Sequence, residues 1–162
     1  MKKTRVNIFW FRRDLRLEDN CGLYHALSSD LPVVPVFIFD KNILKSLQSD
    51  DPRVMFIHDS LETLRDKLKK KNKDLFTLYD SPKGAWKDVL KKFDVNAVYS
   101  NEDYEPYALG RDSEIKELLK KNDSNFFQYK DHSIFCKNDV LKKDGRPYTI
   151  YTPYKNKWME TL

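Results

Sequence analysis

The segment 12–20 is the part of the chain richest in residues that can do chemistry. It carries three arginines and three acidic residues but no glycine. Guanidinium groups recognise anions through paired N–H donors, so these arginines can contact an anionic ligand. The alternative is a loop in which the neighbouring acids neutralise the arginines and nothing is bound. The arginines are Arg12, Arg13 and Arg16, and the acids are Asp14, Glu18 and Asp19.

The elements around this segment place it at the edge of a sheet. Residues 6–11 form a short, apolar, β-favouring run with the length of a buried strand. Asp19 or Asn20 can cap a helix whose apolar residues begin at Leu23. A strand-to-helix turn in an α/β protein lies at the carboxyl edge of the sheet, where such folds bind ligands. Because this turn lacks glycine, it does not indicate the backbone-cradled pyrophosphate of a dinucleotide fold.

The same alternation of strand and helix continues to residue 129. Four further apolar runs predict strands, and spacings of three and four apolar residues predict the helices between them. We therefore expect an α/β protein with a Rossmann-like three-layer fold, in which a five-stranded parallel sheet carries helices on both faces. The later strands are expected at 33–39, 75–79, 95–99 and 126–129, and the helices at 21–29, 52–68, 82–93 and 106–122.

The composition is that of one globular domain. The chain has 162 residues, of which 40% are hydrophobic and 14% aromatic, enough for a sizeable core. The net charge of +5 gives mild attraction to nucleic acid or other anions. The lysine-rich run 67–73 suits a solvated helix end, with a DNA-binding patch as the alternative.

Several classes of site and location are not indicated. The three histidines and two cysteines have no metal-ligand spacing, and no serine lies in a nucleophile motif. No metal site is therefore expected. With no secretory signal and no long apolar segment, the chain is expected in a reducing cytoplasm, without a membrane partner.

Three segments of the chain resemble one known family. Residues 10–20 read Trp-Phe-Arg-Arg-Asp-Leu-Arg-Leu-Glu-Asp-Asn, which closely resembles the amino-terminal signature of the DNA photolyase and cryptochrome family. Residues 101–107, with Arg111-Asp112, resemble the loop that follows the family's fourth strand. Residues 151–158 resemble the passage from the α/β domain into its linker. The three matches occur in the expected order and span essentially the whole chain.

The resemblance implies a division of the chain into two parts. A photolyase-type α/β domain is expected at 1–131, and the start of an interdomain linker at 132–162. The sequence stops inside an aromatic-rich element with no cap, which indicates a chain that is cut rather than finished. The resemblance implies that the catalytic FAD lies in a C-terminal helical domain absent from this sequence, so no catalytic residue is expected in this chain.

The function implied by the resemblance is light-driven DNA repair by the full-length protein. A light-harvesting antenna chromophore would pass excitation to a reduced flavin, which splits pyrimidine dimers in UV-damaged DNA. The alternative is a cryptochrome-type blue-light photoreceptor without repair activity, and a less favoured one is a standalone nucleotide-binding module. The loop after the fourth strand does not separate the first two. The protein is expected to be a monomer that acts with its FAD-binding domain in cis.

The resemblance also implies an antenna site at the carboxyl edge of the sheet. In the folate-binding branch an Asn-Glu pair follows the Tyr-Glu of the fourth-strand loop, whereas this chain has Tyr107-Ala108. The difference favours a deazaflavin or flavin antenna over methenyltetrahydrofolate. Asp14 and Arg16 are expected to tie this domain to the absent one, and for Arg13 and Arg53 both roles stay open. The candidate cofactor-binding residues are Phe11, Arg12, Arg13, Asp40, Arg53, Asn101 and Asp103.

Overall fold

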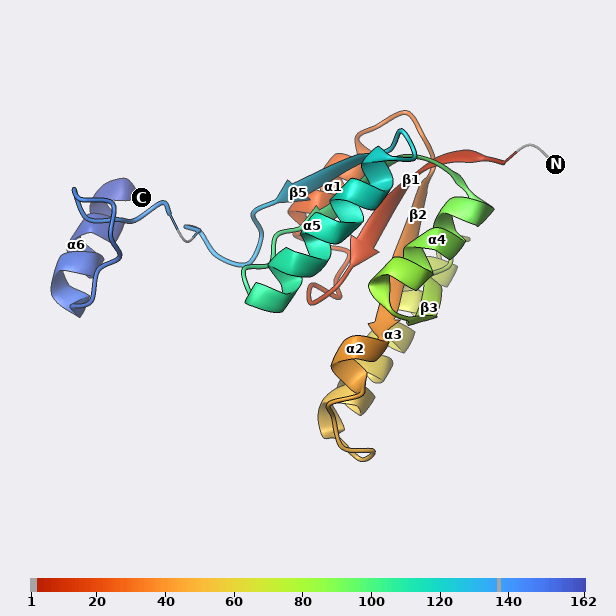
Figure 1. Ribbon diagram of the computed structural model, residues 1–162, viewed down its shortest axis with the longest axis horizontal. Coiled ribbons are helices and arrows are strands. Elements are labelled where there is room, and N and C mark those ends of the chain that lie inside the picture. Colours follow the sequence, from red (N-terminus) through yellow and green to blue (C-terminus); the bar gives the residue numbers. More distant parts are fainter. Residues whose placement is uncertain (1–2, 137) are drawn as a thin grey trace.

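The computed structural model describes residues 3–136 and 138–162. Five strands form one parallel sheet with helices on both faces, as the sequence predicts (Figure 1). The strands are β1 (Arg5–Phe11), β2 (Val33–Asp40), β3 (Phe76–Asp80), β4 (Asp94–Asn101) and β5 (Asn125–Tyr129). The helices are α1 (Cys21–Leu27), α2 (Lys41–Leu44), α3 (Pro52–Lys69), α4 (Pro82–Lys92), α5 (Pro106–Lys120) and α6 (Tyr151–Thr161).

The strand order opens a crevice at one edge of the sheet. The order is β3-β2-β1-β4-β5, and every pair of neighbours is parallel. The chain moves outward from β1 to β3 and then returns to the other side of β1 with β4. At such a reversal the two connections leave in opposite directions, and open α/β sheets bind ligands there. The crevice lies at the carboxyl ends of β1 and β4.

Strand β1 is buried on both faces. Ile8 and Trp10 pack with Trp86 of α4 in one apolar cluster, where the two indole rings meet edge to face at 5.3 Å. Phe9 and Phe11 alternate with them and pack in a second cluster with residues of α1 and α3. A central parallel strand covered on both sides needs this continuous apolar run. The charged segment that follows β1 is therefore attached to the most deeply buried part of the sheet.

The helix starts follow the capping rules. Asn20, rather than Asp19, caps α1, and its Oδ1 accepts a hydrogen bond from the amide of Leu23 at 3.1 Å. Asp51 and Ser81 cap α3 and α4 in the same way, as the Asp-Pro and Ser-Pro pairs predict. The sequence did not indicate α2, because four residues are too few for a periodic pattern. This short helix begins directly after its cap, Asp40, and extends the end of β2.

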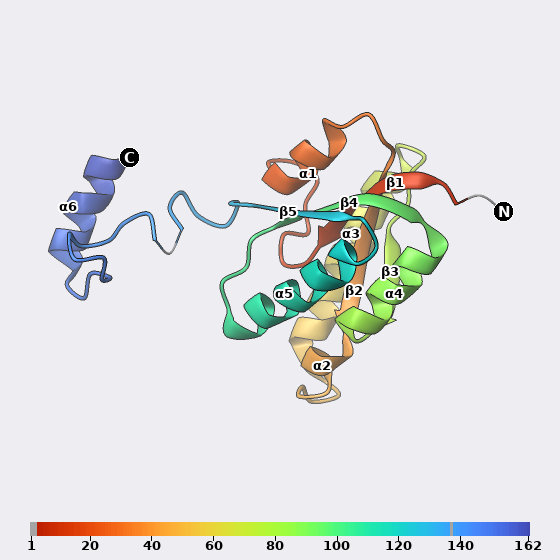
Figure 2. The same ribbon diagram turned by 45° about the horizontal axis from the view of Figure 1, so that its top comes forward.

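The segment after β5 has little regular structure. Helix α6 lies beyond the carboxyl end of β5, apart from the sheet, and none of its residues is buried (Figures 1 and 2). Asp144-Gly145 forms a turn, in which Gly145 has a φ of 77° and its amide bonds to the carbonyl of Lys142. The division near residue 131 stays a prediction. Within 3–136 and 138–162, no helix has the length and apolar character needed to cross a membrane.

Gly22 is expected to be intolerant of a side chain. A Cβ there would lie 2.7 Å from Asn101 Oδ1 and 3.1 Å from the backbone of Ser100, so something must shift. We expect Gly22→Ala to lower the free energy of unfolding by about 1–3 kcal/mol, the range of an overpacked core site. Urea denaturation followed by circular dichroism measures this.

Gly110 provides the matched control, because it is also helical and, in the described part of the chain, no atom outside its own helix backbone and chain neighbours lies within 4 Å of a Cβ built there. Gly110→Ala should raise the free energy of unfolding by about 0.5–1 kcal/mol through helix propensity. Equal effects of the two substitutions would contradict the close approach of α1 to β4.

Candidate functional site

A cleft of about 220 Å³ opens at the carboxyl edge of the sheet. Its walls come from the ends of β1 and β2, from α2, and from the loop and first turns of α5. Five of the seven predicted residues line it, whereas Arg53 and Asn101 do not. The five are Phe11, Arg12, Arg13, Asp40 and Asp103.

The inner wall of the cleft is apolar and aromatic. Phe37 and Phe39 at the end of β2 meet edge to face at 5.0 Å, and both line the cleft with Phe11. Ile43 and Leu44 of α2 add to this wall. Flat aromatic and aliphatic side chains of this kind suit a planar ring system.

Arg12 has a structural role in the site. Its side chain is only 6% exposed and forms an ion pair with Asp112 at 2.5 Å. It also donates a hydrogen bond to the backbone carbonyl of Asn101. Burial lowers the pKa of Arg12, and the Asp112 carboxylate opposes that effect. Arg12 thus fixes the end of β1 to α5 and β4.

Two guanidinium groups lie over the same indole ring. The Cζ atoms of Arg12 and Arg111 are 5.2 and 5.0 Å from the ring centroid of Trp10. Trp10 also lines the cleft. The ring's electron-rich face helps to hold the two cations close together.

Arg13 is the half-exposed cation of the cleft mouth. Its side chain is 52% exposed and its Nη1 lies 3.0 Å from Glu105 and 3.5 Å from Asp103. The hydrogen bond to Glu105 is the main cause that raises the pKa of Arg13. Because exposed pairs are weak, a ligand can displace Glu105 at little cost.

Asp40 and Tyr107 connect opposite walls. The Tyr107 hydroxyl donates to Asp40 Oδ2 at 2.5 Å, and Asp40 Oδ1 accepts from the amide of Asn42 at 2.9 Å. Burial is the main cause that raises the pKa of Tyr107, and the Asp40 carboxylate adds to it. The hydrogen bond from Asn42 and the positive charge of Arg111 act to lower the pKa of Tyr107.

Asn101 is a structural centre on the other side of the sheet edge. Its Nδ2 donates to Asp14, to Asn20 Oδ1 at 2.9 Å and to Asp131 Oδ2 at 3.1 Å. Its Oδ1 accepts from the amide of Gly22 at 2.8 Å. Because both polar atoms of its side chain are engaged, Asn101 holds the turn after β1, the start of α1 and the end of β5 together.

Asp14 and Arg16 bind within this domain. Arg16 forms an ion pair with Asp131 at 2.6 Å, and Asp14 accepts hydrogen bonds from Asn20 and Asn101. The partners that the structure gives both residues lie inside the α/β domain. Their predicted contact with an absent domain stays untested.

Arg53 lies outside the cleft. Its side chain is 71% exposed and pairs with Asp51 at 2.5 Å. Hydrogen bonds from Arg53 lower the pKa of Asp51 to about 2. Arg53 therefore reinforces the cap of α3.

The most informative cleft residue that the sequence analysis missed is Arg111. The Arg111-Asp112 pair belongs to one of the family motifs, but its place more than one turn into α5 did not indicate which face it occupies. Glu105, Tyr107 and Ala108 also line the cleft and lie in or beside that motif. A helical projection of the sequence starting at Pro106 could have indicated which face of α5 Arg111 occupies.

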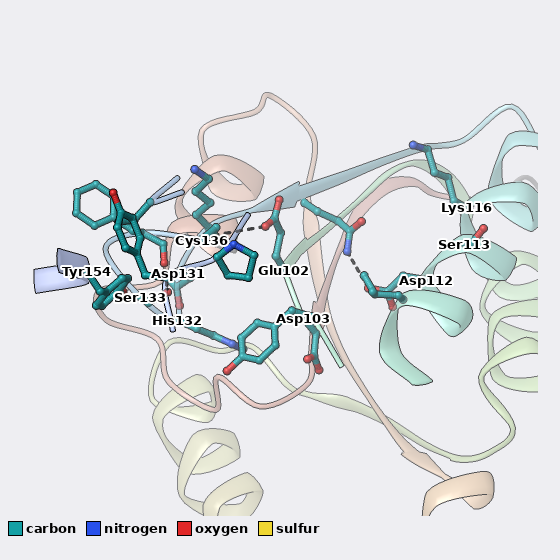
Figure 3. A pocket seen from close by; sticks show the side chains of 18 residues that line it. Glu102, Asp103, Asp112, Ser113, Lys116, Asp131, His132, Ser133, Cys136 and Tyr154 are labelled. Carbon is teal, nitrogen blue, oxygen red and sulfur yellow. Dashed lines mark hydrogen bonds between the residues drawn. The ribbon is translucent and has the colours of Figure 1, made fainter. Parts of the chain in front are cut away.

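A second, larger cavity of about 750 Å³ lies between the end of β5, α5 and the segment after residue 131 (Figure 3). Cys136 points toward Glu102 there, with Sγ 3.8 Å from Oε2. Burial, followed by the nearby Glu102 carboxylate, raises the pKa of the Cys136 thiol. Tyr148 and Tyr154 close the far side. The sequence did not predict this cavity.

The hydrogen bond between Tyr107 and Asp40 is testable by titration. We expect Tyr107 to ionise above the ordinary tyrosine pKa of about 10. Asp40→Asn should lower its pKa, because the substitution removes the negative charge that favours the neutral phenol. NMR of the ¹³Cζ-tyrosine-labelled chain measures the midpoint, with Tyr107→Phe assigning the signal. A Tyr107 midpoint that does not change in Asp40→Asn would contradict this contact.

The fold and the cleft define a class of protein. A doubly wound parallel sheet with an aromatic, charged cleft at the carboxyl ends of its strands is the architecture of a domain that binds a nucleotide or a heterocyclic cofactor. The family model for DNA photolyase matches residues 7–162. The chain therefore belongs to the DNA photolyase family.

Individual relatives agree with this assignment. The chain is 30% identical over 151 residues to a deoxyribodipyrimidine photo-lyase of Synechococcus sp., covering 93% of this chain and 31% of that protein. An archaeal photolyase from Sulfolobus tokodaii, whose structure holds two FAD molecules with the implication of a novel light-harvesting cofactor, is 34% identical with a TM-score of 0.70. That match covers 85% of this chain and 33% of the archaeal chain.

A cryptochrome gives the same fold. The Synechocystis sp. cryptochrome superposes with a TM-score of 0.86 at 20% identity, covering 99% of this chain and 34% of the cryptochrome chain. At this identity the match shows the fold alone. The chain spans about a third of the length of these relatives.

Proposed function

We propose that this chain is the antenna-chromophore domain of a photolyase, and that the full-length protein uses light to split pyrimidine dimers in damaged DNA. The observation that carries the proposal is the cleft at the carboxyl ends of β1 and β2, with its aromatic wall and charged mouth. The catalytic FAD belongs to a C-terminal domain joined in cis through the segment 132–162. The α/β domain is not catalytic by itself.

The residues of the cleft fit a planar chromophore. Phe39 provides a flat apolar surface backed by the buried rings of Phe11 and Phe37. Arg111 Nη2 is buried beside Asp112 Oδ1, at 2.9 Å. The cleft volume of about 220 Å³ is below the roughly 300–1,000 Å³ typical of sites for drug-sized ligands, so it suits a ring system with its tail outside.

We propose a flavin or deazaflavin rather than a folate. Ala108 lies in the cleft wall, at the position where the folate-binding branch carries an acidic residue. The cleft has no carboxylate at that position to hold a folate. The second FAD of the archaeal relative supports a flavin-type antenna in this family.

The chain's own residues bind the chromophore, orient it and shield it from water. The aromatic wall excludes water from one face of the ligand. Arg13 releases Glu105, pairs with the ligand and so closes the mouth of the cleft. Asp40 and Tyr107 fix the ring's polar edge. When bound, the chromophore supplies absorption of near-ultraviolet or blue light and transfer of the excitation to the catalytic flavin.

A cryptochrome-type photoreceptor is the second candidate, because the chain is also 28–29% identical to cryptochrome-2 proteins of Gallus gallus and Arabidopsis thaliana. Repair of dimer-containing DNA by the full-length product under blue light decides between the two. Repair supports the photolyase. A bound, photoreducible flavin without repair would contradict it. We also propose that the full-length protein is a monomer located in the cytoplasm. Sedimentation of the same sample tests the monomer.

Arg13→Ala and Asp103→Ala should weaken the antenna without unfolding the domain. Each removes a charged group from the cleft mouth, and a charged hydrogen bond is worth about 1.5–3 kcal/mol, so the chromophore Kd should rise at least about tenfold. Reconstitution of the full-length protein with FMN, followed by absorbance, measures occupancy.

The matched control is Arg146→Ala, whose side chain is exposed and pairs only with nearby Asp144 among the residues that the structure describes. It should leave the stoichiometry unchanged. Full occupancy in both cleft variants would mean that the chromophore binds elsewhere.

A further inference from the structure

The lysine-rich run 67–73 has no part in the cleft. It covers the end of α3 and the first part of the turn that leads into β3. All five of its lysines are exposed, and among the residues that the structure describes none of them forms an ion pair. The neighbouring carboxylates of Glu62 and Asp74 pair with Arg65 instead. The five are Lys67, Lys69, Lys70, Lys71 and Lys73.

Stabilisation of helix α3 explains only part of this run. The lysines of the last helical turn complement the helix dipole. Lys71 and Lys73 lie beyond the helix, in a turn where Asn72 has a φ of 56°. The amide of Lys73 closes this turn by bonding to the carbonyl of Leu68 at 3.0 Å. Like charges held this close together repel, so the unpaired lysines weaken the fold rather than stabilise it.

The topology places the end of α4 beside this turn. Each helix runs back along the sheet, so α3, α4 and α5 all end where the next strand begins (Figure 1). Lys92, the last residue of α4, has its Nζ 4.3 Å from the ring centroid of Phe76, where β3 begins. Lys3 Nζ donates to the carbonyl of Leu90 at 2.8 Å. The amino terminus and two helix ends therefore lie together at the amino edge of the sheet.

The turn after α5 completes this edge. Ser124 Oγ donates to the carbonyl of Val95 at 2.6 Å, which holds the turn against the start of β4. Exposed Lys120 and Lys121 precede the turn. We call the exposed surface of the segments 66–75, 91–94 and 120–124 the basic edge.

The basic edge holds the whole net charge of the chain. Its three segments contain nine lysines and four aspartates, an excess of five positive charges. The net charge of the complete chain is also +5, so the remainder is neutral as a whole. The cleft lies at the carboxyl edge, and α6 lies beyond the carboxyl end of β5 (Figures 1 and 2). The excess charge is thus at the other end of the sheet and does not serve the cleft.

The chemistry of the basic edge favours phosphates in a row. Lysine binds phosphate as a point charge, without the fixed geometry of a guanidinium. The apolar residues in the α3 segment, Leu68 and Leu75, are only 8% and 3% exposed, so they cannot insert into a lipid bilayer. A surface of unpaired ammonium groups without accessible leucines suits the backbone of a nucleic acid.

We propose that the basic edge is a nucleic-acid contact that binds backbone phosphates without regard to sequence or damage. It is separate from the cleft and from any site that recognises a lesion. Phosphate contacts of this kind release counterions and attract DNA over long distances, so they concentrate the protein near its substrate. The inference goes beyond the proposed function and holds whether or not the cleft binds a chromophore.

Titration of a labelled, undamaged DNA duplex with the 162-residue chain tests the inference. This chain contains both apolar clusters of the sheet, on which the basic edge is built. Fluorescence anisotropy gives the binding constant at several NaCl concentrations. The logarithm of the binding constant should fall against the logarithm of the salt concentration, with a slope of about −3 or steeper.

A triple variant locates the contact. Lys70→Gln, Lys71→Gln and Lys73→Gln together should make the slope shallower by about 2–3, because each lost phosphate contact removes about 0.9. Circular dichroism checks that the variant is folded.

The matched control makes the same change in net charge elsewhere. Lys45→Gln, Lys87→Gln and Lys143→Gln replace exposed lysines outside the three segments, none of which forms an ion pair within 3–136 and 138–162. The slope of this control should change by less than about 1.

Three outcomes would overturn the inference. The first is a wild-type chain that does not bind the duplex even at low salt. The second is an equal change of slope in the two triple variants, which would mean that net charge alone attracts DNA. The third is tighter binding to vesicles that contain phosphatidylserine than to the duplex, which would assign the edge to a membrane. Each of them leaves the cleft and its proposed chromophore untouched.

Discussion

The buried carboxylate of Asp112 is the interaction on which the ligand edge of this domain depends. It accepts from Arg12 at the end of β1, from Arg111 in its own helix and from Gln128 of β5. A buried charge is tolerated only when it is paired. Removing one partner leaves the remaining buried charges uncompensated, so that their desolvation destabilises the fold. This single anion therefore sets the positions of both buried arginines and brings α5 close to the crevice.

The division of labour among the charged residues follows from this arrangement. The arginine-rich turn after β1 could be, from its sequence, either an anion site or a neutralised loop, and in the structure all three of its arginines pair with carboxylates. Arg12 and Arg16 are neutralised within the domain, and Arg13 stays at the open mouth. The cation that faces the cleft with only a shared partner comes from α5, about 100 residues further along the chain.

Periodicity and capping predicted the five strands, the long helices and the charged carboxyl edge where the cleft lies, because each depends on local spacing. Four-residue α2 carries no such signal, although Ile43 and Leu44 complete the apolar wall. Whether a loop residue faces the cleft depends on tertiary pairing, which local spacing does not encode. Arg53 lies in the first turn of α3 and binds Asp51. The side chain of Asn101 is fully engaged in the hydrogen bonds that join three segments.

The separation of the cleft-forming residues along the chain has a consequence for the order in which the domain assembles. The contacts of Arg12 with Asn101 and Asp112 join positions 89 and 100 residues apart, and β1 pairs with β4 rather than with a hairpin partner. Such non-local pairings form late, since the intervening chain must first be closed into a loop. On the ribosome, β1 can pair with β2 early, but its contacts with β4 and α5 form only after residue 112 has emerged. The complete cleft therefore forms only late in the folding of a new chain.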